Sequence, residues 1–333
     1  MTGKFLKAKY GIPGYAIASL SAIEITLRLF GFGNPALLQA NTEAGYIFAP
    51  NQTVYRFGNR LEYNQFSQRS EPIVAKKPEG TLRILMTGDS VLNGNNTTDQ
   101  KETISELFEA RLLGIKKRVE VLNASAGSWG IGNQLGYIRK FGTFESDAVI
   151  LQIGTHDLVQ PTGSSNRVGN DPLMPNRTPL FAIQEVFERH IIPKFSSIFV
   201  SNASPAGLPV PEEVRFRENM QKLEEIAALV RSKNIQLFVL YTCDRADLLP
   251  VPNQPKFKSL FFDRLKVLKI GVIDTHAAWS KMPKKRVESY FRDGVHPTAP
   301  AYESIADVMF QRLCTQKKLV ACGAVNTPDK NLL

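Results

Sequence analysis

Ser90 is the residue of this chain whose surroundings are most typical of a nucleophile. It ends the tripeptide Gly88-Asp89-Ser90, which follows an apolar run at 83–87 and precedes a polar turn and a helical pattern. This order places a serine hydroxyl at the end of a predicted strand. Because a serine hydroxyl is a weak nucleophile at neutral pH, it needs a base within hydrogen-bond reach and a third group that orients the base.

His296 is the strongest candidate for that base among the four histidines. Asp293 lies three residues earlier, and on a turn this spacing lets its carboxylate meet Nδ1 of the ring while Nε2 faces outward. Pro297 disfavours helix at the residue before it, so it keeps His296 in a loop. His276, at the end of a predicted strand, is a weaker rival. The residue types and their spacing therefore make Ser90, His296 and Asp293 candidates for a triad.

The elements that must position these residues alternate between strands and helices. Short apolar runs predict buried strands, and helical patterns lie between them. Such alternation predicts an α/β fold, a three-layer sandwich with a parallel sheet in the order 2-1-3-4-5 and helices on both faces. The predicted strands are 83–87, 119–122, 148–153, 235–241 and 271–274, and the predicted helices are 102–114, 131–141, 212–233, 257–269 and 299–315.

Three segments that contain glycine and polar residues directly follow predicted strands. They are 88–90, 123–129 and 154–157. Ligand sites of parallel α/β sheets lie beyond the carboxyl ends of the strands. We therefore expect these segments to meet at one edge of the sheet, although they are far apart in the sequence.

The chain divides into segments of different composition. We predict a membrane anchor or apolar helix at 1–32, an extended approach segment at 33–80, and a main domain at 81–320. The approach segment is rich in proline and polar residues, which argues against a second core. A long insertion at 158–211 interrupts the main domain, and such insertions often line or cover a site. Residues 321–333 are predicted to form a C-terminal tail.

Four motifs of the chain, in this order and after these predicted strands, resemble those of the SGNH hydrolase family, also called GDSL esterases and lipases. The resemblance covers roughly residues 82–315. It implies a flavodoxin-like parallel sheet, with Ser90 as nucleophile, His296 as general base and acid, and Asp293 as the residue that orients His296. The motifs are Gly88-Asp89-Ser90, Asn123-Ala124-Ser125-Ala126-Gly127-Ser128-Trp129-Gly130, Gly154-Thr155-His156-Asp157 and Asp293-Gly294-Val295-His296.

The same resemblance implies an oxyanion hole built from the backbone N–H of Ser90 and that of a residue in the second motif. The family's glycine aligns with Ser128, and Gly127 is one residue earlier. In the third motif the family carries an asparagine where this chain has His156. A neutral imidazole can also donate one N–H, so we expect His156 to replace that amide donor. The alternative is a histidine that only packs at the rim of the site.

A further stretch at 64–69, NQFSQR, precedes the first motif. It resembles an N-x-x-G-x-R pattern of membrane-anchored bacterial relatives, with Ser67 in place of the glycine. The sequence suggests no role for it.

The N-terminal region points to a membrane. Three lysines among the first nine residues precede a largely apolar run at 10–32, which predicts an anchor that starts in the cytoplasm and an extracytoplasmic catalytic domain. Glu24 and Arg28 interrupt the run, and their i, i+4 spacing allows them to pair. A cleaved signal peptide is one alternative. A helix that lies on the membrane or packs on the domain is the other.

Charge and cysteine content limit the expected partners. The 41 Lys and Arg against 31 Asp and Glu give a net charge of +10, but the basic residues are scattered and no nucleic-acid motif is present, so no nucleic-acid partner is expected. Cys243, Cys314 and Cys322 form no CxxC pattern or Cys/His cluster, so we expect neither a metal site nor a cofactor. Cys314 and Cys322 could pair in an oxidising compartment or stay as free thiols. The sequence predicts no oligomeric state.

These features predict a serine hydrolase that acts on ester bonds through an acyl-enzyme. The predicted anchor and the basic surface favour a small-molecule or glycan ester as substrate, in particular O-acyl groups of a carbohydrate or an exported polysaccharide. One alternative is a carbohydrate O-acyltransferase with the same triad. The other is a non-catalytic glycan- or lipid-binding protein on the same fold, which is considered because His156 replaces the family's asparagine.

Overall fold

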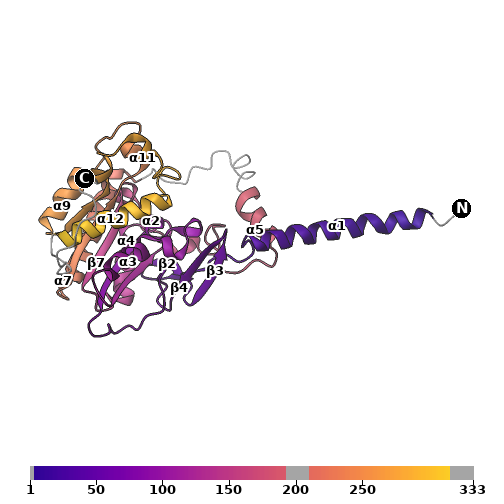
Figure 1. Ribbon diagram of the computed structural model, residues 1–333, viewed down its shortest axis with the longest axis horizontal. Coiled ribbons are helices and arrows are strands. Elements are labelled where there is room, and N and C mark those ends of the chain that lie inside the picture. Colours follow the sequence, from indigo (N-terminus) through magenta and orange to yellow (C-terminus); the bar gives the residue numbers. More distant parts are fainter. Residues whose placement is uncertain (1–3, 193–209, 316–333) are drawn as a thin grey trace.

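A five-stranded parallel β-sheet forms the centre of the protein (Figure 1). The computed structural model describes residues 4–192 and 210–315. The strands lie in the order β6-β5-β7-β8-β9 and each neighbouring pair is parallel, which confirms the predicted order 2-1-3-4-5. They are β5 (Leu82–Gly88), β6 (Val119–Ser125), β7 (Ala148–Gly154), β8 (Gln236–Thr242) and β9 (Gly271–Asp274).

Helices cover both faces of this sheet, so the fold is the α/β sandwich that the sequence predicted. The main covering helices are α3 (Ile104–Leu113) and α12 (Ala299–Thr315) on one face, and α4 (Ile131–Phe141) and α7 (Glu212–Arg231) on the other. Every residue of β5 and β7 is buried, because a central strand of a doubly covered sheet has no solvent face. Leu85 packs in the core of α4 and α7 and its neighbour Met86 in the core of α3 and α12, since successive strand residues point to opposite faces.

Short helical segments complete the domain and lie mostly in the connections at its edges. Those that follow β5 are α2 (Ser90–Asn93), η1 (Asn95–Thr97) and η2 (Gln100–Glu102), and η3 (His156–Val159) follows β7. Those between β8 and α12 are α8 (Arg245–Leu248), α9 (Lys258–Val267), α10 (Thr275–Trp279) and α11 (Lys284–Glu288).

The segment 33–80 contains two antiparallel hairpins in addition to extended chain. They pair β1 (Leu38–Asn41) with β2 (Gly45–Phe48), and β3 (Gln52–Arg56) with β4 (Asn59–Tyr63). Phe57 and Gly58 form the turn of the second hairpin with φ of 53° and 83°, as a type I′ turn requires. The sequence lacks the usual Asn-Gly or Asp-Gly signal there, so it did not predict the hairpin. Tyr46 and Tyr63 are buried in the core of α4 and α7, so this segment packs on the main domain.

Helix α1 (Lys4–Leu29) extends away from the sandwich and contacts α5 (Ala182–Val186) (Figure 1). Glu24 and Arg28 pair as predicted, with 2.7 Å between Arg28 Nε and Glu24 Oε1. The Glu24 carboxylate also accepts the backbone N–H groups of the first two residues of α5, at 2.8 and 3.1 Å. Across residues 4–192 and 210–315, no helix combines the length and the apolar character needed to cross a membrane. The N-terminal anchor stays a prediction.

The described part of the insertion 158–211 packs on the domain. It holds η4 (Ser165–Arg167), α5 and the π-helical turn η5 (Phe187–Ile191). The Gly163 N–H donates to Asn133 Oδ1 of α4 at 2.8 Å, which ties the start of the insertion to the sandwich. The rest of the insertion at 193–209, the predicted tail and any pairing of Cys314 with Cys322 lie outside the described residues.

Candidate active site

The candidate residues meet at the edge of the sheet where the strands end. Ser90 begins α2 directly after β5, Gly127 follows β6, and His156 follows β7. His296 lies in the loop between α11 and α12. Because the strands run in the same direction, their carboxyl ends share one edge, and residues as distant as Ser90 and His296, 206 positions apart, lie in contact.

Ser90, His296 and Asp293 form a continuous chain of hydrogen bonds. His296 Nε2 lies 3.0 Å from Ser90 Oγ, and His296 Nδ1 lies 2.7 Å from Asp293 Oδ2. Both distances are within the reach that a nucleophile, its base and the orienting group require. In the neutral ring the carboxylate draws the proton to Nδ1, which leaves Nε2 free to accept the Ser90 hydroxyl. The structure thus brings together the three residues that the sequence predicted as a triad.

The loop around Asp293 holds its carboxylate in the ionised form. Asp293 Oδ1 accepts the backbone N–H groups of Val295 and His296, both at 2.8 Å. Partial burial acts to raise the pKa of Asp293, but these N–H groups and the His296 ring lower it to about 2. The Arg245 N–H donates to the Gly294 carbonyl at 2.8 Å and attaches the loop to α8. The carboxylate is therefore ionised at neutral pH and can stabilise a protonated His296.

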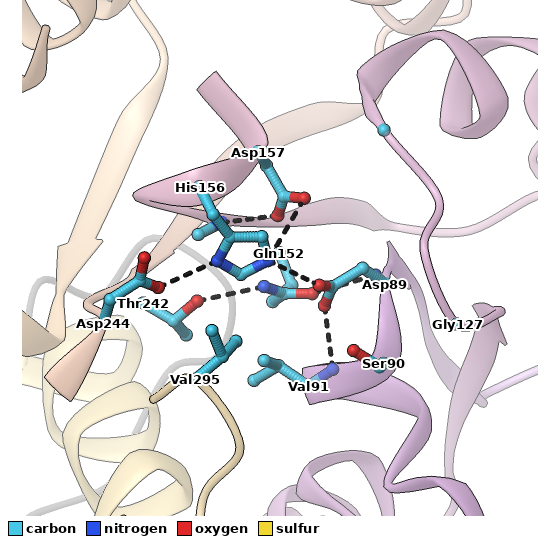
Figure 2. A network of polar contacts seen from close by, with 12 residues as sticks. Asp89, Ser90, Val91, Gly127, Gln152, His156, Asp157, Thr242, Asp244 and Val295 are labelled. Atoms are coloured by element: carbon cyan, nitrogen blue, oxygen red, sulfur yellow. Dashed lines mark hydrogen bonds and ion pairs between the residues drawn. The ribbon is translucent and has the colours of Figure 1, made fainter. Parts of the chain in front are cut away.

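Asp89 and Gln152 shape the turn that presents Ser90 (Figure 2). Asp89 Oδ1 accepts the Val91 N–H at 2.8 Å and caps α2. The Asp89 N–H donates to Gln152 Oε1 at 3.0 Å. A Cβ at Gly88 would stand 2.4 Å from the same oxygen, so glycine is needed where the turn packs on β7.

The stretch 64–69, for which the sequence suggested no role, forms a tight turn. Asn64 Oδ1 accepts two backbone N–H groups of this turn, at 2.9 and 3.1 Å. Ser67 has a φ of 61°, in the left-handed region that glycine adopts most easily. A glycine at this position of the N-x-x-G-x-R pattern suits the left-handed backbone of the turn, and Ser67 adopts the same conformation here.

This turn directs Arg69 into the loop that follows the nucleophile. The Arg69 side chain is wholly buried and its guanidinium donates hydrogen bonds to backbone carbonyl oxygens. The acceptors are Asn95 at 2.8 Å, Thr98 at 2.5 Å, and Asn93. One side chain thus holds three points of the loop 93–98.

Gly127 lies beside Ser90, where an oxyanion donor is needed. A Cβ added to Gly127 would stand 4.0 Å from Ser90 Cβ and 3.5 Å from Asn95 Oδ1. Tyr46 of β2 donates its hydroxyl proton to the Gly127 carbonyl at 2.7 Å, which holds this segment in place. Ser128 has a φ of 61° and forms the turn that follows. Of the two residues predicted for this loop, Gly127 is the one that these contacts place beside the nucleophile.

Asn95 is a candidate that the sequence did not single out. It starts η1 with a φ of 50°, and its side-chain oxygen Oδ1 lies 3.5 Å from the Cβ position of Gly127. Its sequence signal was the polar turn Asn93-Gly94-Asn95-Asn96. That run does not reveal which side chain approaches Gly127, because the direction depends on the backbone of the loop.

His156, predicted as an oxyanion donor, has both ring nitrogens in contact with other partners. Its Nδ1 lies 2.8 Å from Asp244 Oδ1, and its Nε2 lies 2.9 Å from Asp89 Oδ2 (Figure 2). Both ring nitrogens face carboxylates, so neither has an N–H left for an oxyanion at Ser90. The ring instead ties the end of β7 to the nucleophile turn and to the loop after β8.

The charge of His156 also differs from the prediction of a neutral ring. Burial acts to lower the pKa of His156, but the carboxylates of Asp157, Asp244 and Asp89 raise it to about 12. The ring is therefore an imidazolium at neutral pH. Asp157 is itself fully buried, and its burial and the charge of Asp89 raise the pKa of its carboxyl.

His276, the weaker rival for the base, has other partners. Its Nδ1 lies 2.9 Å from Lys258 Nζ, and its Nε2 lies 3.3 Å from the Asp247 carbonyl oxygen. Lys258 also pairs with Asp274 at 2.9 Å. His276 thus belongs to a separate buried polar cluster, and His296 is the histidine that contacts Ser90.

Comparisons with known proteins agree with this architecture. Residues 86–303 match the model of the GDSL-like lipase/acylhydrolase family. No curated protein with which the chain was compared matches it.

Similar solved structures share little sequence with the chain. A GDSL-like lipase from Bacteroides thetaiotaomicron is 15% identical, with 72% of this chain and 90% of that chain covered and a TM-score of 0.40. TesA is 13% identical, with 69% and 97% covered and a TM-score of 0.42. The acetyl xylan esterase AlAXEase is 12% identical, with 69% and 98% covered and a TM-score of 0.44.

Proposed function

Because the chain belongs to the GDSL-like lipase/acylhydrolase family, we propose that it is an esterase that forms an acyl-enzyme on Ser90. The observation that carries this proposal is the chain of contacts from Ser90 Oγ through His296 to Asp293, at 3.0 and 2.7 Å. In this arrangement a weak hydroxyl nucleophile has a base, and the base has an orienting carboxylate.

Acylation begins when His296 Nε2 takes the Ser90 hydroxyl proton while Oγ bonds to the carbonyl carbon of the ester. The carbonyl oxygen becomes an oxyanion, and Asp293 stabilises the imidazolium. His296 then gives its proton to the leaving alcohol oxygen as the ester C–O bond breaks. In deacylation His296 takes a proton from water, the hydroxide oxygen bonds to the acyl carbon, and the proton returns to Ser90 as the acid leaves.

The oxyanion needs donors other than the missing asparagine of the family. We assign the backbone N–H groups of Ser90 and Gly127 and the side-chain amide of Asn95. Ser90 starts a helix, and the first N–H groups of a helix have no partner within it. Asn95 Oδ1 lies 3.5 Å from the Cβ position of Gly127, so the assignment requires the amide to turn and present Nδ2, its donor atom, in place of this oxygen. A single donor of this kind stabilises the transition state by roughly 2.7 to 4 kcal/mol.

The exposure of the site favours a small acyl group on a large carrier. The side chains of His296 and Asp293 are 31% and 52% exposed, so the base lies at the protein surface. A substrate that projects from a polymer can reach such a site without entering a deep pocket. We propose O-acyl groups of a carbohydrate, such as acetyl esters, as the substrate class.

The same exposure allows an acyl acceptor other than water to reach the acyl-enzyme. A carbohydrate hydroxyl can replace water in the second step, since His296 would deprotonate it in the same way. The protein would then be an O-acyltransferase. Product analysis with and without a carbohydrate acceptor separates the two activities, because hydrolysis releases the free acid and transfer yields a new ester.

A fluorophosphonate probe tests the nucleophile directly. We expect one label per folded molecule on Ser90, located by mass spectrometry, and no label on Ser90→Ala or His296→Ala. Ser259→Ala is the control, since Ser259 is an exposed serine on α9. Labelling that persists in Ser90→Ala would contradict the proposal. A folded parent protein that takes no label and cleaves no acetyl ester would favour the non-catalytic binding protein.

A further inference from the structure

Three potential ligand atoms converge beside the nucleophile turn, outside the proposed triad. Asp89, His156 and Asp157 each offer one, and these atoms all lie within 4.8 Å of one another (Figure 2). His156 Nε2 is 2.9 Å from the Asp89 oxygen and 3.5 Å from the Asp157 oxygen. Asp89 and Asp157 are buried, so the cluster lies within the protein.

Each of the three residues has its other polar atom held by a separate partner. The remaining atoms are Asp89 Oδ2, His156 Nε2 and Asp157 Oδ1, and a turn of any of the three side chains would break a hydrogen bond. The holding contacts are Val91 N–H to Asp89 Oδ1 at 2.8 Å, Gly154 N–H to Asp157 Oδ2 at 2.7 Å, and His156 Nδ1 with Asp244 Oδ1 at 2.8 Å.

Asp157 Oδ1 is the atom that points to a ligand. Asp157 is 0% exposed, and this oxygen accepts no hydrogen bond from the described residues. A buried carboxylate oxygen without a donor is costly, because nothing replaces the water that it lost. It faces His156 Nε2 at 3.5 Å, which is long for a hydrogen bond. A cation between these atoms would satisfy the oxygen.

The spacing and the donor types fit a transition-metal ion. With bonds of about 2.0 to 2.2 Å, two ligands of one Zn²⁺ ion stand roughly 3 to 3.5 Å apart. The distances of 2.9 and 3.5 Å in the cluster match this range. An imidazole nitrogen suits Zn²⁺, whereas Mg²⁺, Ca²⁺ and Mn²⁺ prefer oxygen ligands.

Asp244 completes the arrangement from the other side of the ring. Histidines that bind metals commonly donate their second ring N–H to a carboxylate, which sets the ring orientation. Asp244 Oδ1 stands in this position at 2.8 Å from His156 Nδ1.

We propose that Asp89, His156 and Asp157 bind one divalent transition-metal ion, with Zn²⁺ as the best match, and that Asp244 orients His156 for it. The ion takes the place of the Nε2 proton, and the ring keeps the Nδ1 proton for Asp244. Because Asp89 precedes Ser90 and caps α2, the ion ties the nucleophile turn to the end of β7. Its role is to position the turn, so it adds no step to the ester chemistry.

Calorimetric titration of the chelator-treated full chain with ZnCl₂ tests this site. We expect one ion per molecule for the parent, loss of that binding in Asp157→Asn, and roughly 10- to 100-fold weaker binding in Asp244→Asn. Asp263→Asn is the matched control, because Asp263 is an exposed aspartate on α9. Zn²⁺ should also raise the melting temperature of the parent and of Asp263→Asn, but not that of Asp157→Asn.

Two further variants keep the outcome interpretable. Thiolates also bind Zn²⁺, so the double variant Cys314→Ser with Cys322→Ser tests whether these cysteines supply the binding. It should bind Zn²⁺ as the parent does. Ser90→Ala should bind it unchanged, so the result does not depend on the proposed esterase activity. If Asp157→Asn fails to fold, Asp244→Asn carries the comparison. A parent without a Zn²⁺ site, or equal binding by the parent and Asp244→Asn, would overturn the proposal.

Discussion

Arg69 Nη1 donates a hydrogen bond to the carbonyl oxygen of Asn95 at 2.8 Å. This contact joins the turn at 64–69 to the loop that carries the proposed amide donor. A lysine at this position could reach one carbonyl but could not match the spread donors of a guanidinium. We expect Arg69→Lys to lower kcat for a small acetyl ester by roughly 10- to 100-fold, with little change in KM, because the loop shifts.

The melting temperature of Arg69→Lys should fall as well, since buried carbonyl groups lose their donors. Arg118→Lys is the control, because Arg118 is exposed and lies just before β6. A variant at position 69 that keeps the kcat of the parent would show that the loop holds Asn95 without this contact.

Asn95 is expected to contribute to kcat as an oxyanion donor. Asn95→Ala removes the proposed Nδ2 donor, so kcat for a small acetyl ester should fall roughly 100- to 1000-fold while KM changes little. Steady-state kinetics on the folded variants measure this. The neighbouring Asn96→Ala serves as the control and should keep most of the activity. The assignment fails if the two variants behave alike.

The acid side of the pH–rate profile should reflect one proton. The pKa of Asp293 is lowered to about 2, so its charge is present above that value and is lost only as the pH falls through about 2. Asp293 therefore takes up no proton between roughly pH 7 and pH 4 and adds no second ionisation to the profile there. We expect log kcat/KM to fall with a slope of one on acidification. A slope of two over this range, with the fold intact by circular dichroism, would contradict an ionised Asp293.

His156 is expected to matter more for stability than for oxyanion stabilisation. His156→Ala leaves the buried Asp89 and Asp157 without the ring between them, and breaking a buried charge pair costs about 3 to 5 kcal/mol. Urea unfolding in the presence of chelator measures the loss. His156→Asn should be destabilised in the same way, because a neutral amide does not replace an imidazolium. If His156→Asn is as stable and as active as the parent, the result would instead support His156 as an oxyanion donor, the role that the asparagine has in the family.

Glu109 gives the protein a pH-dependent loss of stability. Burial and nearby carboxylates raise the pKa of Glu109 from an ordinary value of 4.5 to about 7. The Val121 N–H, which donates to Glu109 at 2.6 Å, opposes this rise. The folded protein holds the Glu109 proton more tightly than the unfolded chain does. The stabilisation from this proton is therefore complete below pH 4.5 and is lost as the pH rises through 7. Glu109→Gln should therefore melt at a higher temperature than the parent near pH 8, with a smaller difference near pH 4. Thermal unfolding at both pH values checks this, and an unchanged difference between them would contradict the raised pKa.

Some features of this protein followed from the sequence because they depend on local patterns. Buried strands separated by helices have few arrangements in a parallel sheet, so the order of the five strands was predictable. The contact of Asp293 with His296 spans three residues and needs only a turn. The placement of Ser90 at a strand end follows from the apolar run before it. The contact of Ser90 with His296 over 206 positions was predicted through the resemblance of four motifs to a known family.

Other features were decided only by the tertiary structure. The direction of the His156 ring depends on Asp89 and Asp244, 67 and 88 positions away, and nothing near His156 in the sequence marks either one as its partner. The approach of Asn95 to Gly127 likewise depends on a loop that Arg69 holds from another segment. Residue types and spacing thus determined which groups reach the edge of the sheet. Which atoms face one another was determined by packing, because a side chain turns toward the partners that the whole fold brings within reach.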